Sequence, residues 1–179
     1  MAPVRELERR SVMSAQPTSF PDKWRRFWAR DRQDRALISQ AALILPLTEI
    51  GLRVFGFRRW KRIIENFVPG RQRCQSVPDG QIRERAVRTA RAVRSAELHG
   101  LSRPNCLERS MALWWMLRRE GVDVDLEIGA RNQGGRFEAH AWIELDGQVL
   151  NDDVEVRTHY ARFDAPITVG DAKSPRTQN

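Results

Sequence analysis

The chain has 179 residues, a length that fits one domain, or one domain with a helical appendage, and excludes two full enzyme domains. An apolar content of 41%, with six Trp and seven Phe, is enough to bury a core and excludes a wholly disordered chain. The charge is uneven, because residues 1–100 carry 21 basic and 10 acidic side chains, whereas residues 101–179 carry 10 and 13.

The N-terminal part is predicted to be a tail followed by a long helix. Residues 1–21 are polar and lack periodicity, so we expect a flexible tail without a signal peptide. Apolar spacing predicts a helix over residues 24–67, which Pro46 kinks or divides. Its most apolar stretch, residues 36–57, contains polar side chains and falls short of the ~20 apolar residues of a membrane span. We therefore expect it to pack against protein, with shallow membrane contact as the second possibility.

A second helix is predicted over residues 81–99, after a loop rich in Pro and Gly. Apolar side chains recur along one of its faces. Another face carries four arginines, here called the arginine stripe: Arg85, Arg88, Arg91 and Arg94. A solvated helix face is the simplest interpretation of this stripe, and a docking surface is the alternative.

The pattern changes after Gly100. Residues 106–120 are predicted to form a helix that Gly121 ends, and residues 122–130 alternate as a half-buried strand does. A second alternating strand is expected over 137–145, and the hairpin signal Asp146-Gly147 leads into a third strand over 148–151. Helices followed by a helix and an antiparallel meander predict an α+β fold.

We therefore divide the chain into four parts. They are a flexible tail over 1–21, a helical N-terminal subdomain over 22–100, an α+β core over 101–165 and a second flexible tail over 166–179. The two cysteines, Cys74 and Cys106, are too few for a disulfide scaffold or a four-ligand zinc site, so a cytoplasmic protein is expected. Neither a metal nor another cofactor is expected, since the three histidines are scattered and no glycine-rich phosphate loop is present.

Cys106 lies at the start of its predicted helix, where Asn105 and Glu108 have the spacing of a capping box. Unpaired N–H groups and the positive end of the helix dipole favour a thiolate there and could stabilise an oxyanion. A lone cysteine is more often a small buried apolar residue, so its position alone favours the structural interpretation.

His140 lies on the predicted strand 137–145, from which it can approach a facing helix start and serve a thiol as base. A third group would orient the imidazole, and the candidates after the hairpin are Asn151, Asp152 and Asp153. A two-residue turn would place Asp153 opposite His140, and a three-residue bulged turn would place Asp152 there. The residues alone leave this choice open.

Three segments carry a resemblance to a known family: NCLERSMALWWMLRR at 105–119, GVDVDLEIGAR at 121–131 and AHAWIELDGQVLND at 139–152. Over residues 101–152 the chain resembles the lasso peptide leader peptidases, of the transglutaminase-like branch of papain-type cysteine proteases. The resemblance implies a papain/transglutaminase-like catalytic core over 101–165 with a triad of Cys106, His140 and Asp152. Asn151-Asp152 matches the Asn-Asp pair of that family, so the resemblance favours Asp152 over Asp153.

The resemblance also implies a function and partners. Such a thiol protease removes the leader from a ribosomally made lasso peptide precursor during maturation of an antimicrobial peptide, and an asparagine-synthetase-like cyclase then closes a macrolactam ring. Leader recognition by a separate small winged-helix protein is expected, because residues 24–100 show no three-strand pattern of such a module. The alternatives are a transglutaminase-like acyltransferase and an inactive scaffold or basic binding module.

The basic half remains to be explained. Of the 31 basic residues 28 are Arg, and they spread over several helices without a groove-reading motif, so nucleic-acid binding is not expected. We expect the arginine stripe to dock the recognition partner or the bound leader, with an anionic membrane surface as the second possibility.

Overall fold

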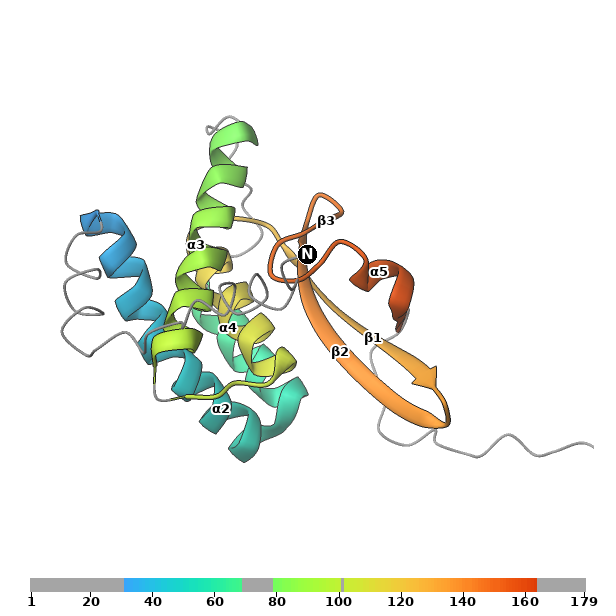
Figure 1. Ribbon diagram of the computed structural model, residues 1–179. Coiled ribbons are helices and arrows are strands. Elements are labelled where there is room, and N and C mark those ends of the chain that lie inside the picture. The colour runs from blue at the N-terminus through green and yellow to red at the C-terminus, as the bar shows by residue number, and fades with distance from the viewer. Residues whose placement is uncertain (1–30, 69–78, 101, 164–179) are drawn as a thin grey trace, which may run out of the picture. The chain divides into compact units, whose positions relative to one another are not determined.

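The computed structural model describes residues 31–68, 79–100 and 102–163. The chain divides into two compact units after Arg35. The second unit begins at Ala36, within the first described helix. Its helices and strands follow one another in the order that the α+β prediction requires (Figure 1). The two predicted tails, the predicted start of the first helix at residue 24, and Cys74 lie outside the described residues.

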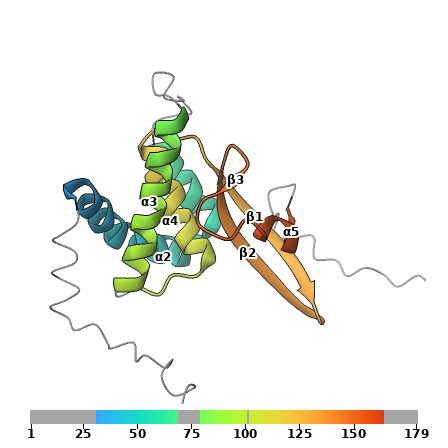
Figure 2. The ribbon, with the colours of Figure 1, turned by 45° about the horizontal axis from the view of Figure 1, so that its top comes forward.

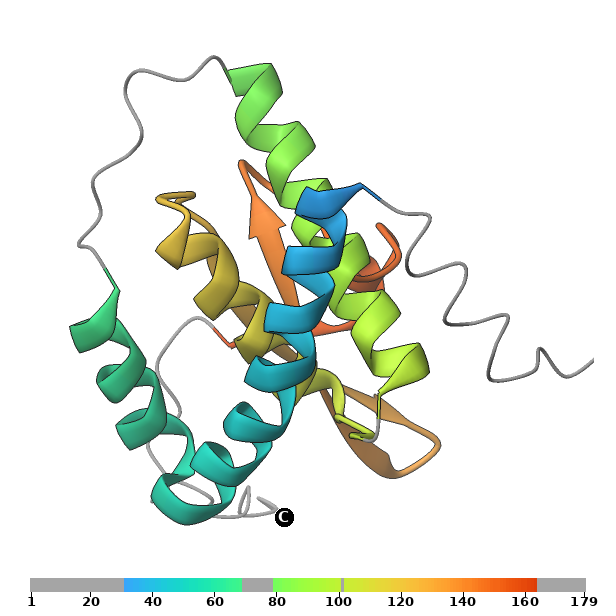
Figure 3. The same cartoon turned by 90° about the vertical axis from the view of Figure 1, so that its left-hand side faces the viewer.

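Helix α2 (Arg32–Phe67) changes direction at Gly56, whose φ of 72° lies in the left-handed region that favours glycine (Figure 3). The interruption was expected at Pro46, but non-helical backbone occurs at Gly56 instead. Proline keeps φ near the helical value, whereas a positive φ redirects the chain. After the break, Trp60 packs onto Gly51, where an added Cβ would lie 2.3 Å from the Trp60 ring.

By length and composition, α2 is long and apolar enough to cross a membrane. The polar side chains within residues 36–57 had led us to expect that this stretch falls short of a membrane span. One of its faces is buried within the unit and includes Ile38, Ala41, Leu45 and Thr48. Another face exposes four aliphatic side chains at helical spacing, each by at least 42%: Leu43, Leu47, Ile50 and Val54. We call these four residues the aliphatic stripe. Helix α2 therefore belongs to the core along one face only.

Helix α3 (Asp79–His99) packs against α4 through small side chains, including Ala86, Ala90 and Ala96. The buried Thr89 donates a hydrogen bond of 3.2 Å to the carboxylate of Glu120. Of the arginine stripe, Arg85, Arg91 and Arg94 are exposed and Arg88 is half-buried. At the end of α3, His99 Nδ1–H donates to the Ser95 carbonyl over 2.8 Å, as expected of a histidine near a helix C-terminus.

Helix α4 (Cys106–Arg119) begins and ends with hydrogen bonds that its sequence predicts. Asn105 accepts from the Glu108 N–H over 2.9 Å, and Glu108 accepts from the Asn105 N–H over 2.8 Å, which confirms the capping box. At the other end, Gly121 has a φ of 76°, and the Val122 N–H donates to the Leu117 carbonyl. This Schellman motif confirms Gly121 as the residue that ends the helix.

The four strands form one antiparallel sheet in the order β3-β2-β1-β4. They are β1 (Asp125–Gln133), β2 (Arg136–Leu145), β3 (Gln148–Val149) and β4 (Ala161–Arg162), and the short helix α5 (Val156–His159) precedes β4. Strand β1 starts later than the alternation predicted: Val122 and Val124 are buried but precede the sheet. Strand β3 is shorter than predicted.

The three long helices of this unit lie on one side of the sheet, and the β1–β2 hairpin extends beyond them (Figures 1, 2 and 3). Helix α4 supplies the side chains that meet β2, and the core where they join contains fully buried Met111, Leu113, Leu117 and Ile143. This packing holds the start of α4 against the strand that carries His140.

Candidate functional site

Cys106 is the first residue of α4 and carries a free, half-buried thiol. The capping box fixes the backbone on both sides of it, because Asn105 and Glu108 bond to each other's N–H groups. Of the first N–H groups of α4, that of Glu108 donates to Asn105, whereas those of Cys106 and Leu107 have no partner within the helix and can donate to an oxygen that develops negative charge. The thiol therefore stands where an acyl-transfer nucleophile would have oxyanion donors within its own helix.

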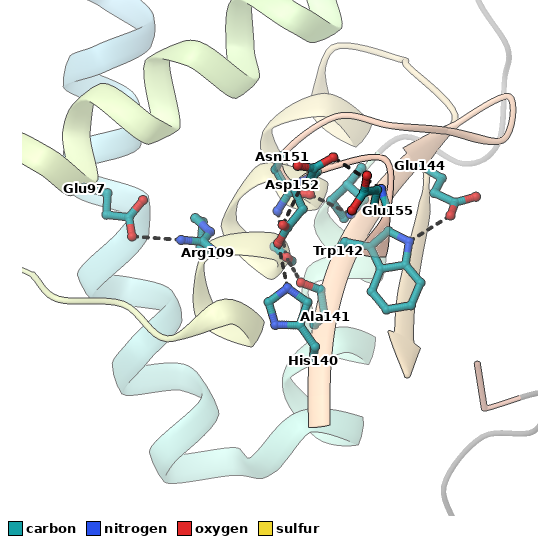
Figure 4. A network of polar contacts seen from close by, with 12 residues as sticks. Glu97, Arg109, His140, Ala141, Trp142, Glu144, Asn151, Asp152 and Glu155 are labelled. Carbon is teal, nitrogen blue, oxygen red and sulfur yellow. Dashed lines mark hydrogen bonds and ion pairs between the residues drawn. The ribbon is translucent and has the colours of Figure 1, made fainter. Parts of the chain in front are cut away.

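His140 and Asp152 form a direct contact, drawn in Figure 4. His140 Nε2 lies 2.6 Å from Asp152 Oδ2, and the two side chains are 20% and 25% exposed. A carboxylate only accepts hydrogen bonds, so this contact places a proton on Nε2 and leaves Nδ1 of the neutral ring to accept. The structure thus brings together the two residues predicted to be the base and the orienting carboxylate.

Asn151 joins the Asp152 segment to both α4 and β2. Its Nδ2 donates to Ser110 Oγ over 2.8 Å, and its Oδ1 accepts from the Ile143 N–H over 2.8 Å. Ser110, which is fully buried, in turn donates to the Ala141 carbonyl over 2.9 Å. These three hydrogen bonds hold the residue before Asp152 and the residue after His140 in one network.

The same network relates the thiol to the imidazole. Ser110 lies four residues after Cys106 and therefore on the same face of α4, and it bonds the strand residue next to His140. Among the described residues, no hydrogen bond joins the Cys106 thiol to His140 or Asp152. Catalytic hydrogen bonds are often long before substrate binds, so this arrangement is compatible with a Cys-His pair.

The type of hairpin turn does not decide which aspartate contacts His140. Asp146 and Gly147 form a two-residue turn with φ values of 49° and 75°, and Leu145 pairs with Gln148. Continued pairing would have placed Asp153 opposite His140. The sheet pairing ends at Val149, and the chain beyond it turns so that Asp152 reaches the imidazole. Asp153 instead accepts from the Glu155 N–H over 3.3 Å.

Aromatic rings hold His140 from the sheet side, which the sequence did not predict. The His140 ring stacks on Tyr160 with centroids 5.1 Å apart, and Trp142 lies 6.4 Å away. This approach requires glycine at position 129, the residue paired with His140: a Cβ there would lie 2.9 Å from Tyr160 Cβ and 3.0 Å from the Ala161 carbonyl oxygen. The only signal in the sequence was a lone glycine inside a strand.

A buried carboxylate fixes Trp142 in turn. Glu144, 3% exposed, accepts from Trp142 Nε1 over 2.8 Å (Figure 4). Its carboxylate also pairs with Arg162 over 2.5 Å. Burial raises the pKa of the nearby Glu127 carboxyl; Arg162 acts against this rise and Glu144 adds to it. Glu144 and Arg162 therefore hold Trp142, which lies beside the His140 ring.

The other histidines do not join the site. His99 bonds within α3, and His159 lies exposed at the end of α5. Across the described ranges, no group of three or more His, Cys, Asp or Glu side chains could hold a metal ion.

Comparison with known proteins gives a family and one relative. Residues 51–163 match the model of the transglutaminase-like superfamily, which is more than half of the chain. A segment of 53 residues is 42% identical to the microcin J25-processing protein McjB of Escherichia coli. That match covers 30% of this chain and only 24% of the relative's length. No solved structure matches. These two matches confirm the resemblance stated from residues 101–152.

Proposed function

Because the chain belongs to the transglutaminase-like superfamily, we propose that it is a cysteine peptidase that removes the leader from a lasso peptide precursor. The observation that carries this proposal is the His140–Asp152 pair, on a strand that Ser110 ties to the helix of Cys106. The identity to a microcin-processing protein supports a peptide precursor as substrate.

The proposed first step forms a thioester. His140 Nδ1 accepts the Cys106 proton, and the thiolate attacks the carbonyl carbon of the last leader residue. N–H groups at the start of α4 stabilise the oxyanion. The imidazolium, stabilised by Asp152, then gives its proton to the leaving amine, so the C–N bond breaks and the core peptide departs with a free amino group.

The second step releases the leader. A water molecule loses a proton to His140 Nδ1 and attacks the thioester, and the C–S bond breaks as the proton returns to the sulfur. The leader leaves with a free carboxylate, and Cys106 is restored. Throughout, Asp152 holds the ring through Nε2 so that the same nitrogen serves both steps.

The partners belong to the same proposal. A separate small winged-helix protein would present the leader, and an asparagine-synthetase-like cyclase would consume the released core in the cytoplasm. The aliphatic stripe of α2 supports contact with a membrane surface as a secondary property.

Substitution of the nucleophile tests the proposal most directly. C106A should abolish precursor cleavage while thermal unfolding and binding of the recognition partner stay unchanged, measured by mass spectrometry of the precursor and by calorimetry. Leader cleavage by C106A at the normal rate would exclude the assigned nucleophile. D152A and D153A, assayed side by side, separate the two aspartates: D152A should lower kcat by about 10²- to 10⁴-fold, whereas D153A should change it little.

The second candidate is transfer of the acyl group to an amine, which the same triad chemistry permits. Product analysis in the presence of a primary amine distinguishes the two. A leader ending in a free carboxylate supports the peptidase, whereas a leader joined to the amine supports the acyltransferase.

A further inference from the structure

Two hollows lie end to end along α3, beside the candidate site. The larger, of about 480 Å³, is bounded by Arg91 and Arg94 of α3, Arg109 of α4 and the segment Asn151 to Asp153. The smaller, of about 270 Å³, lies between the start of α3 and the β2–β3 turn. Both are lined by Val87 and Leu150, so they adjoin each other, and the two together are here called the α3 groove. Asp152 is one of the residues that line the larger hollow.

The α3 wall of the groove carries positive charge. Arg83, Arg91 and Arg94 line the groove and are exposed. Arg109 differs, because Glu97 holds its Nη1 over 2.9 Å. On the opposite wall, Asp152 contacts His140, and Asp153 accepts a hydrogen bond from the Glu155 N–H. The arginine stripe is therefore divided: Arg91 and Arg94 face the groove, and Arg85 and Arg88 do not line it.

From this arrangement we infer that the α3 groove binds an extended acidic segment of the peptide substrate, with an Asp or Glu side chain held by Arg91 and Arg94. The inference rests on the proposed function, since it gives the substrate's path to a site used for peptide cleavage. Guanidinium groups recognise carboxylates through paired hydrogen bonds, and a hollow of this size accommodates several side chains.

The length of the groove sets the length of the segment. From Gly80 to Arg94 the helix rises by about 21 Å, at ~1.5 Å per residue. An extended peptide covers that distance with about six residues, at ~3.3 Å each. Because Asp152 lines the same hollow as Arg91 and Arg94, the acidic side chain that these arginines bind belongs within about six residues of the bond to be cleaved.

Reactive peptides test this inference without knowledge of the natural precursor. Peptidyl chloromethyl ketones place their residues before the reacting carbon, and bromoacetyl peptides place theirs after it. In both, the cysteine sulfur forms a bond to carbon and a halide ion leaves. Each series carries one Asp, or one Asn in its place, at successive positions, and the second series is made with a free or an amidated C-terminus. The rate of Cys106 alkylation in the full chain is measured by mass spectrometry.

We expect one position at which Asp accelerates alkylation by about five- to tenfold over Asn, as for one or two partly exposed charge pairs. The double variant R91Q/R94Q should lose this preference, so that Asp and Asn peptides react at equal rates. The matched variant R85Q/R88Q removes the same charge from the same helix and should keep the preference. Thermal unfolding of both variants verifies that they are folded.

The possible failures are distinguishable. Equal alkylation by Asp and Asn peptides at every position, in a protein whose Cys106 reacts with them, overturns the α3 groove proposal and leaves the proposed function standing. If R91Q/R94Q still prefers Asp over Asn peptides, the α3 groove proposal is also overturned. It is likewise overturned if only peptides with a free C-terminus react faster, because a terminal carboxylate is then the ligand. If no peptide alkylates Cys106, both the groove and the proposed function fail.

Discussion

Cys106, at the start of α4, and Asp152, beyond β3, are held by different means. The backbone around Cys106 is fixed by Asn105 and Glu108, within one turn of the same helix. Asp152 lies past the end of β3, and its neighbour Asn151 is held by Ser110 of α4, 41 residues away in the sequence, and by the Ile143 N–H. The surroundings of Cys106 are thus built by local signals, whereas the position of Asp152 depends on tertiary packing. Substitutions on each side should therefore have different consequences.

Among substitutions outside the proposed triad, the largest effect is expected from N151A. The substitution removes both hydrogen bonds of the amide and leaves the Ile143 N–H, in a fully buried residue, without its acceptor, at a cost of about 1–3 kcal/mol. The segment that carries Asp152 should then relax, and a displacement of 1 Å lowers kcat by about 100-fold. Steady-state cleavage and urea unfolding measure the two effects. If kcat is kept in a destabilised N151A, Asn151 does not position Asp152.

A similar loss of stability, with a smaller loss of cleavage, is expected from G129A. The new Cβ would meet Tyr160, the Ala161 carbonyl and Trp142 at 2.9 to 3.0 Å, and two of these contacts involve packed rings or backbone that cannot easily move. Overpacking of this kind costs about 1–3 kcal/mol and should displace the His140–Tyr160 stack. The control is G80A in α3, where a Cβ meets no atom within 4 Å. G80A should unfold at the same or a higher temperature than the parent chain.

The start of α4, which carries Cys106, should tolerate the loss of its N-cap residue. N105A removes the acceptor for the Glu108 N–H and should cost about 0.5–2 kcal/mol of stability. The start of α4 remains anchored by Ser110, so cleavage should fall much less than in N151A. Asn132, at the exposed end of β1, provides a matched Asn-to-Ala control with an expected change within ~0.5 kcal/mol. A loss of cleavage in N105A equal to that in N151A would remove the distinction between the two sides.

The smallest effect is expected at the far end of α4. Burial raises the pKa of the Glu120 carboxyl above its ordinary 4.5, against hydrogen bonding by Thr89 and the charge of Arg85. A raised pKa in the folded state means that ionisation costs stability as the pH rises through that range. E120Q should therefore match the parent chain near pH 3.5 and be slightly more stable at pH 7, by urea unfolding at both pH values. E84Q, on the exposed surface, should show no such gain.

Local signals predicted the fold well. The capping box, Gly121 and the Asp146-Gly147 turn each involve neighbours in sequence, and all three occur as expected. The prediction failed where tertiary contacts decide. The direction of α2 changes at Gly56 because the left-handed backbone there lets Trp60 reach Gly51, and nothing in the local pattern distinguished Gly56 from Pro46.

The candidate site shows the same limit. Cys106 and His140 were recognisable from a helix start and a strand pattern, and the family resemblance favoured Asp152. Register alone favoured neither aspartate, and the observed two-residue turn would have selected Asp153 if pairing had continued. The roles of Asn151, Ser110 and Tyr160 come from hydrogen bonds and stacking between distant segments, which periodicity does not encode.

The hydrogen bond between Ser110 and Asn151 joins residues 41 positions apart in the sequence, and this separation affects the order of folding. Contacts between near neighbours form before contacts that close long loops. Helix α4 and the β2–β3 hairpin can each form early, whereas the contact that holds the Asp152 segment requires both to have met. We therefore expect a folding chain to form the helix start that carries Cys106 before His140 and Asp152 are in position, so that the proposed activity appears only with the last tertiary contacts.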